Sequence, residues 1–244
     1  MVIRDFLGWV RDDYNLDAAT VQRYFITLKA FYRWAIEEGF TNENPTTKIK
    51  LAKPSQKVIR GLLPEQIKTM IDVVKGDSQE SARNKAIILI LLDCGIRVSE
   101  LANLKIDDVD MKRGVIIVMG KGSKQRLARL GLKTQKALWN YMVYRKNTSP
   151  WLWINRNGKR LTVTGVQQMI RELGWKIGIR LHPHLLRHTF AISFLRNGAN
   201  TFECQYALGH SSLEMTRRYC QALSFDDVFK RHELASPVDN ALSK

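Results

Sequence analysis

Residues 44–64, NPTTKIKLAKPSQKVIRGLLP, constrain the fold most, because they contain three prolines and little hydrophobic periodicity. Proline fixes its own φ and disfavours a helical conformation of the residue before it, so no helix is expected to run through this stretch. We therefore predict a linker at residues 53–61, between a short helical domain at residues 1–52 and a larger domain at residues 62–244. The stretch has no acidic residue and five basic residues that could follow a phosphate backbone: Lys48, Lys50, Lys53, Lys57 and Arg60.

Apolar residues recur every three or four positions on both sides of the linker, which predicts helices. Before the linker, this pattern occupies VIRDFLGWVRDDY and TVQRYFITLKAFYRWAIEEG, so the first domain is expected to hold two helices. After it, helices are predicted in LLPEQIKTMIDVV, in SARNKAIILILLDCG, which ends at Gly95, and in the short RVSELANL. The chain from Thr162 to its end is also predicted to be helical.

Three short segments between these helices are rich in β-branched and aromatic residues, which predicts strands. They are GVIIVMG, QRLARL and WLWIN, and the turn KGSK joins the first two. The expected fold class is therefore mainly α with a small three-stranded antiparallel sheet (α+β), embedded in the second domain.

The basic residues are concentrated in one part of the chain. The 39 Lys and Arg exceed the 23 Asp and Glu by 16, and residues 111–188 hold 17 basic residues and a single acid, Glu172, so this window accounts for the whole excess. A solvated surface usually mixes both signs, so the pattern favours a nucleic acid partner over an anionic membrane, for which no basic amphipathic helix is evident. Within the window, Lys124 and Arg126 are expected to contact DNA.

The cysteines and the apolar runs bear on the compartment. The three cysteines form no C-x-x-C motif and no paired framework, which indicates free thiols in a reducing interior. The longest apolar run, AIILILL, is too short to span a bilayer, and the first residues do not resemble a signal peptide. We expect a cytoplasmic protein that does not associate with a membrane.

The stretch HPHLLRHTFAISFLRNGAN, residues 182–200, predicts a helix from about His184 with Gly198 as its left-handed cap. His184 and Arg187 are three residues apart and share a face at the helix start. Unpaired N–H groups and the positive end of the helix dipole favour a phosphate there, and Arg187 could hold two of its oxygens. The alternatives are a structural histidine beside a surface arginine, or a metal site that includes His188, although the fixed charge of the arginine argues against a cation.

Three other segments place polar side chains at helix starts or turns. Arg97 begins a predicted helix, and Glu100 follows one turn later on the same face. The KGSK turn carries Lys121 on a tip between two strands. The segment LGHSSLEMTRRYC places His210 just before a predicted helix and Tyr219 in it or just after it.

The segments GIRVSEL, GKGSKQR, HPHLLRHTFA and LGHSSLEMTRRY follow one another along the chain. In this order they resemble the motifs of the tyrosine recombinases, the family of phage integrases and Xer-type resolvases. The resemblance covers about residues 20–240, and the tail KRHELASPVDNAL is similar to that of integrases from mobile elements. It implies a catalytic set formed by Arg97, Lys121, His184, Arg187, His210 and Tyr219.

The resemblance also implies a role for each of these residues. Tyr219 would attack a DNA phosphate to form a 3′-phosphotyrosine and a free 5′ hydroxyl, which conserves the bond energy without ATP. Two arginines would hold the non-bridging oxygens, Lys121 would protonate the leaving oxygen, and no metal or other cofactor is implied. His184 is the better candidate for exchanging a proton with Tyr219 and His210 for a bond to the phosphate. Glu100 is expected to orient Arg97, and His188 to support packing.

The sequence departs from the family in its first domain, which usually has about four helices where two are expected here. Two other functions are considered: relaxation of DNA by a type IB topoisomerase, and a DNA-binding relic that does not cut. The expected partners are a double-stranded recombination site and further copies of the chain, as a dimer on each site and a tetramer in the synapse, joined through the C-terminal tail. An accessory DNA-bending protein is a further possible partner.

Overall fold

The computed structural model describes residues 2–52, 59–120 and 125–242. The chain divides into two compact units, one from Met1 to Lys57 and one from Val58 to Lys244. Each unit has its own buried residues, and each is described separately below. In the described part of the chain, no helix combines the length and the apolar character needed to span a membrane.

The first unit contains α1 (Val2–Asp12) and α2 (Ala18–Glu37), as the apolar spacing predicts. The side chain of Asp17 caps α2 by accepting a hydrogen bond from the backbone N–H of Thr20 at 2.8 Å. The helices pack through a few small or aliphatic residues, of which Leu7 and Val21 are almost fully buried. Several aromatic side chains of this unit remain partly exposed: Phe6, Trp9, Tyr24, Phe31 and Trp34.

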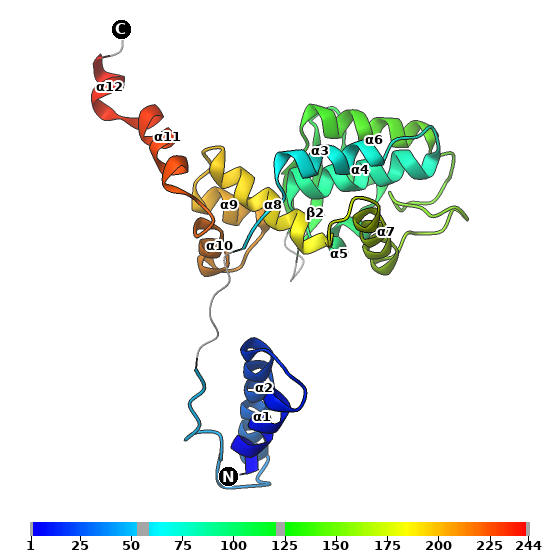
Figure 1. The fold of residues 1–244 in the computed structure, drawn as a ribbon. Coiled ribbons are helices and arrows are strands. Elements are labelled where there is room, and N and C mark those ends of the chain that lie inside the picture. The colour runs from blue at the N-terminus through cyan, green and yellow to red at the C-terminus, as the bar shows by residue number, and fades with distance from the viewer. Residues whose placement is uncertain (1, 53–58, 121–124, 243–244) are drawn as a thin grey trace. The chain divides into compact units, whose positions relative to one another are not determined.

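The second unit is mainly helical, and α4 lies beside α6 in it (Figure 1). Apolar residues such as Ile87, Ile90 and Leu91 make α4 buried on almost every side, and it packs against both α6 and α8. The helices of this unit are α3 (Pro64–Val73), α4 (Gln79–Cys94), α5 (Val98–Ala102), a 3₁₀ turn at Ile106–Asp108, α6 (Leu132–Tyr144), α7 (Val163–Lys176), α8 (Pro183–Arg196), α9 (Thr201–Leu208), α10 (Leu213–Cys220), α11 (Phe225–Ala235) and α12 (Pro237–Leu242).

The sheet has three antiparallel strands in the order β1 (Val109–Asp110), β2 (Val115–Met119) and β3 (Gln125–Arg129). The expected fold class is confirmed, but one of the three predicted strands is wrong. The segment WLWIN forms only isolated bridges, and β1 takes the third place in the sheet.

Side chains explain why WLWIN does not join the sheet. Leu152 and Trp153 are fully buried, which gives the segment the apolar composition of a strand. The carbonyl of Leu152, however, accepts hydrogen bonds from the hydroxyl of Tyr141 at 2.9 Å and from the guanidinium of Arg145 at 3.2 Å. Because side chains satisfy this backbone group, the segment needs no neighbouring strand.

Gly95 ends α4, as predicted, and it also sets the distance between α4 and α8. Its φ of +58° is left-handed, which glycine adopts without strain. A Cβ at this position would lie 2.2 Å from Cδ1 of Phe190 on α8. The close approach brings the carbonyl of Gly95 within reach of Arg187, which lies one turn before Phe190.

Candidate active site

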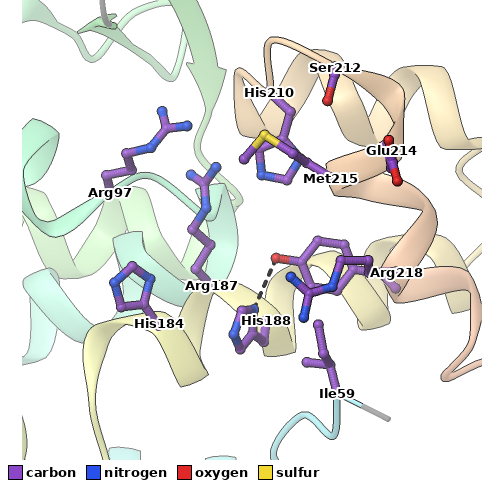
Figure 2. A pocket seen from close by; sticks show the side chains of 11 residues that line it. Ile59, Arg97, His184, Arg187, His188, His210, Ser212, Glu214, Met215 and Arg218 are labelled. Atoms are coloured by element: carbon purple, nitrogen blue, oxygen red, sulfur yellow. Dashed lines mark hydrogen bonds between the residues drawn. The ribbon is translucent and has the colours of Figure 1, made fainter. Parts of the chain in front are cut away.

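A cavity of about 440 Å³ in the second unit gathers most of the predicted catalytic side chains. Figure 2 shows Arg97, Arg187 and His184 along one wall, with His210 and Met215 along the other. Lys121 lies outside the described residues. The residues that line the cavity are Ile59, Arg97, His184, Arg187, His188, His210, Ser212, Glu214, Met215, Arg218 and Tyr219.

Arg187 is held at the base of this cavity by the ends of two helices. Its guanidinium donates to the carbonyl of Gly95, just after α4, at 2.5 Å and to the carbonyl of Leu208, the last residue of α9, at 2.9 Å. The C-terminal end of a helix is negative, so both ends favour a cation there. Burial, and then the charge of Arg97, lower the pKa of Arg187 to about 10, which leaves it protonated at neutral pH. Arg187 is therefore a fixed positive charge that needs no reorientation to meet an anion.

Tyr219 lies in α10 with its hydroxyl directed toward α8. The residue is only 4% exposed, and its Oη is 2.9 Å from Nδ1 of His188, a bond drawn as a dashed line in Figure 2. Burial raises the pKa of the tyrosine, and the nearby Arg187 partly opposes this. The phenol is thus protonated at neutral pH and needs a proton acceptor before it can attack.

The two predicted catalytic histidines occupy different environments. His210 is half-buried, and its Nδ1 lies 2.8 Å from Oγ1 of Thr216. Burial, with the charge of Arg187, lowers the pKa of His210 to about 4, so the ring is neutral. His184 is exposed in the first turn of α8, and its ring centre lies 6.4 Å from that of His188.

The histidine that contacts Tyr219 is not the one that the sequence favours. The sequence favours His184 as the proton partner of Tyr219 and assigns His188 to packing, whereas the hydroxyl bond is made by His188. The signal that could have indicated this is the spacing, because residues four apart on a helix share a face, and His188 is four residues after His184. His182 precedes both and caps α8, with its Nδ1 accepting from the N–H of Leu185.

Comparison with known proteins identifies the family of this site. The sequence profile of the phage integrase family matches residues 60–224, which is well over half of the chain. The chain belongs to this family, the tyrosine recombinases.

Relatives of this tyrosine recombinase include proteins named Tyrosine recombinase XerC. The one from Pediococcus pentosaceus is 32% identical over 218 residues, which are 85% of this chain and 72% of the relative. The one from Bacillus pumilus is 33% identical over 216 residues, which are 84% of this chain and 71% of the relative. Among solved structures, the XerA recombinase shares 27% identity with a TM-score of 0.63, covering 96% of this chain and 82% of that one. The Tn1549 transposon integrase bound to transposon right-end DNA has a TM-score of 0.78 at 24% identity, covering 96% and 85%, which shows a shared fold.

A buried carboxylate in this recombinase orients the second arginine of the site. Glu100 accepts at 2.9 Å from Nη1 of Arg97, and its other oxygen accepts from the backbone N–H of Arg97 at 2.8 Å. Burial raises the pKa of Glu100, but the bonds from Arg126 and Arg97 outweigh this effect and lower it. The carboxylate is therefore ionised and fixes the direction in which Arg97 extends.

Arg126 supplies the second cation to this carboxylate. Its Nη1 and Nη2 donate to the two oxygens of Glu100 at 3.1 and 2.8 Å, and its Nε donates to the carbonyl of Ala207 at 3.2 Å. The sequence predicts that Arg126 contacts DNA, but its side chain is only 8% exposed and its donors are used internally. The structure corrects this expectation: Arg126 joins β3 to the helix start that carries Arg97 and to α9.

Replacing Arg126 with methionine is expected to destabilise the fold and weaken DNA cleavage, because the buried Glu100 would keep one cation instead of two. Loss of one partner of a buried ion pair costs about 3 kcal/mol. Arg129→Met on the same strand is the matched control, since Arg129 is exposed and its change should cost less than about 0.5 kcal/mol. Urea unfolding measures the stability of both variants. Equal losses of stability would show that the pairing of Arg126 with Glu100 contributes no more than the exposed Arg129 does.

The other basic residues expected to bind DNA are placed as follows. Lys48 and Lys50 are exposed in the first unit, and Arg60 is exposed in the second. Lys53, Lys57 and Lys124 lie outside the described residues. The exposed side chains are free to meet a phosphate backbone in each unit.

Proposed function

We propose that this chain is a site-specific DNA recombinase that cleaves and rejoins DNA through a 3′-phosphotyrosine intermediate. The observation that carries the proposal is the position of Tyr219, whose hydroxyl lies in the same cavity as two arginines held by a carboxylate and by helix ends. A phenol beside fixed cations suits attack on a phosphodiester, because the ester formed conserves the energy of the broken bond.

In the proposed reaction, Arg97 and Arg187 hold the two non-bridging oxygens of the scissile phosphate. Negative charge increases on these oxygens in the transition state, and cations that are already in place stabilise it without a cost of reorganisation. Removing one such donor typically lowers the rate by about 10²–10³-fold. His210, neutral and held by Thr216, is placed to donate a further hydrogen bond to the phosphate.

The leaving 5′ oxygen needs a proton, and Lys121 remains the proposed donor. His184, exposed at the start of α8, is proposed to bind the phosphate rather than to contact Tyr219 directly. The side chains supply the positive charge, so the proposed chemistry requires neither a metal nor ATP. Relaxation by a type IB topoisomerase would use similar residues, but the XerC relatives favour recombination.

We also propose that both units contribute to DNA binding. The first unit would act as the core-binding domain, and residues 53–61 as a basic linker along the phosphate backbone. The protein would act in the cytoplasm on chromosomal or mobile-element DNA, with or without an accessory DNA-bending protein. The excess of basic residues at 111–188 supports this role for the second unit, because each neutralised phosphate releases counterions.

A covalent trapping experiment tests the proposed function. A library of duplexes with a randomised segment and one nick, which lets the short product diffuse away, is incubated with the full chain in EDTA. The expected result is a protein–DNA adduct that survives denaturation and maps to Tyr219 by mass spectrometry, and its DNA gives the target sequence. If no adduct forms, or if the DNA is attached elsewhere, the proposed function is wrong.

The C-terminal tail is proposed to join neighbouring copies of the chain in a tetrameric synapse. Ser224 caps α11, and Arg196 of α8 pairs with Asp227 at 3.4 Å, so the first turn of α11 is anchored to its own protomer. Beyond that turn the described side chains are mostly exposed, including the apolar Val228, which is 53% exposed. A head-to-tail contact that closes into a ring would cover this helix.

Ending the chain after Leu223 is therefore expected to leave binding to a half-site intact and to abolish assembly of the four-protomer synapse. A gel-shift titration on full sites and a strand-exchange assay measure the two properties. Val228→Ser should reproduce part of the loss, whereas Lys230→Ser, at an exposed polar position of the same helix, should not. Normal assembly and exchange by the shortened chain would mean that the tail only packs locally.

A further inference from the structure

His188 has a position in the cavity that the proposed reaction does not yet use. It follows Arg187 in α8, and its Nδ1 lies 2.9 Å from Oη of Tyr219, with ring centres 5.5 Å apart. A contact of this length between a histidine nitrogen and the attacking hydroxyl is within the range required of a general base.

The environment of His188 keeps its ring neutral. Burial, and then electrostatic interactions with His184, His182, Arg187 and Arg218, lower the pKa of His188 to about 4. A neutral imidazole has one acceptor nitrogen, and the protonated phenol of Tyr219 is a donor. The bond is therefore satisfied when Nε2 carries the hydrogen and Nδ1 accepts from the hydroxyl.

The other two histidines of the cavity are less well placed for this task. Nδ1 of His210 is paired with Thr216, and its ring lies nearly parallel to that of Tyr219, at 12° with centres 6.2 Å apart. His184 lies in the exposed first turn of α8, one turn before His188. Of these histidines, it is His188 that the structure places in contact with the hydroxyl.

We infer that His188 is the catalytic residue that accepts the proton of Tyr219 during cleavage and returns it during rejoining; this rests on the proposed function. As the bond from Oη to phosphorus forms, the bond from phosphorus to the 5′ oxygen breaks, and the phenolic proton moves to Nδ1 of His188. The leaving 5′ oxygen takes its proton from a separate donor, proposed above as Lys121. In rejoining, a 5′ hydroxyl attacks the phosphotyrosine and gives its proton back to the same donor, proposed as Lys121. The bond from phosphorus to Oη breaks, and the departing Tyr219 oxygen recovers the proton from His188.

Binding of DNA strengthens His188 as an acceptor. The groups that face it are mostly basic: His182, His184 and Arg187 from α8, Arg218 from α10, and Arg97 and His210 across the cavity, with Glu214 as the acid in the lining. A phosphodiester held by the arginines adds a negative charge to this set. A nearby anion favours the protonated imidazole and raises the pKa of His188, so the acceptor becomes more basic when the substrate is present.

The test is single-turnover formation of the covalent adduct by His188→Asn on a nicked duplex selected as described above. The expected rate is lower by about 10²–10⁴-fold at neutral pH. His182→Asn is the matched control, because it removes a histidine from the same helix start while asparagine still caps a helix. Its rate should stay close to that of the unaltered chain.

The pH dependence separates proton transfer from a merely structural role. The rate of the unaltered chain should change little with pH once the pH exceeds the pKa of His188 in the DNA complex, because the ring is then neutral and can accept the proton. Without the acceptor, the reaction depends on the ionised phenol, so the rate of His188→Asn should rise about tenfold per pH unit below the pKa of tyrosine. Added imidazole should restore part of the activity of His188→Ala.

Three results would overturn the inference. The first is an unchanged rate in His188→Asn. The second is a faster rate in this variant, which would mean that His188 restrains Tyr219 before the reaction. The third is a loss of rate that is the same at every pH, without rescue of His188→Ala by imidazole. Melting temperature and gel shift confirm that each variant is folded and binds DNA, and His188→Gln replaces His188→Asn if the latter does not fold. If the unaltered chain forms the adduct at Tyr219 while His188→Asn behaves normally, this inference alone fails. If the unaltered chain forms no adduct, the proposed function itself fails.

Discussion

Tyr219→Phe is expected to yield no covalent adduct with nicked DNA, even after long incubation, because phenylalanine has no oxygen to form a phosphoester. The fold should be little affected, since the change removes one hydrogen bond, to His188, whose net contribution is about 1 kcal/mol. The hydrophobic contacts of the ring with the cluster around Phe190 and Leu195 are retained. Denaturing gel electrophoresis of the labelled duplex measures the adduct, and a native gel shift measures binding.

Tyr206→Phe is the matched control for this prediction. Tyr206 lies on α9 and is 71% exposed, so it loses the same hydroxyl outside the cavity and should react normally. An adduct that persists in Tyr219→Phe would place the nucleophile elsewhere. Loss of DNA binding by the same variant would show that the hydroxyl contributes to binding, contrary to its buried position.

Arg187→Lys is expected to lower the rate of adduct formation by at least about 10²–10³-fold and to destabilise the second unit at the same time. Lysine carries a single ammonium group and cannot reproduce the fork that reaches both the carbonyl of Gly95 and that of Leu208. A carbonyl left without a donor in this buried place costs about 1–3 kcal/mol. The two effects are measured by single-turnover cleavage and by urea unfolding.

Arg196→Lys provides the matched control, because Arg196 lies on the same helix and its Nη2 donates to the carbonyl of Ala222. Its side chain is 49% exposed, so water can replace the lost bond. A normal cleavage rate in Arg187→Lys would remove this residue from the catalytic set. Normal stability would mean that lysine satisfies both carbonyls.

Local chemistry made several elements predictable from the sequence. Gly95 ends a helix because it adopts a left-handed conformation, and Ser224 starts one because its side chain accepts from the N–H of Asp227. These signals act within a few residues, so they do not depend on the rest of the fold. The segment at residues 151–155 could not be predicted in this way, because its carbonyls are satisfied by side chains such as Arg145 that no local pattern indicates.

The motifs identified the residues around the cavity but not all of their contacts. Arg126 shares its inward face of β3 with Ala128, so strict alternation along the strand could have placed it inside. Its partner Glu100 is 26 residues away, and the sequence does not show that the two meet. The contact of His188 with Tyr219 likewise depends on how α8 and α10 pack.

The close approach of Gly95 to Phe190 has a consequence for how mutational data on this chain should be interpreted. A side chain at position 95 would have to displace the Phe190 ring, and Phe190 lies on the same helix as Arg187 and His188. We expect a saturation screen for recombination to score position 95 as intolerant as the arginines, although glycine has no functional group to offer DNA. Intolerance at this position would reflect the packing of α4 against α8 and not a role in the reaction. Unfolding measurements alongside the screen would distinguish the two causes.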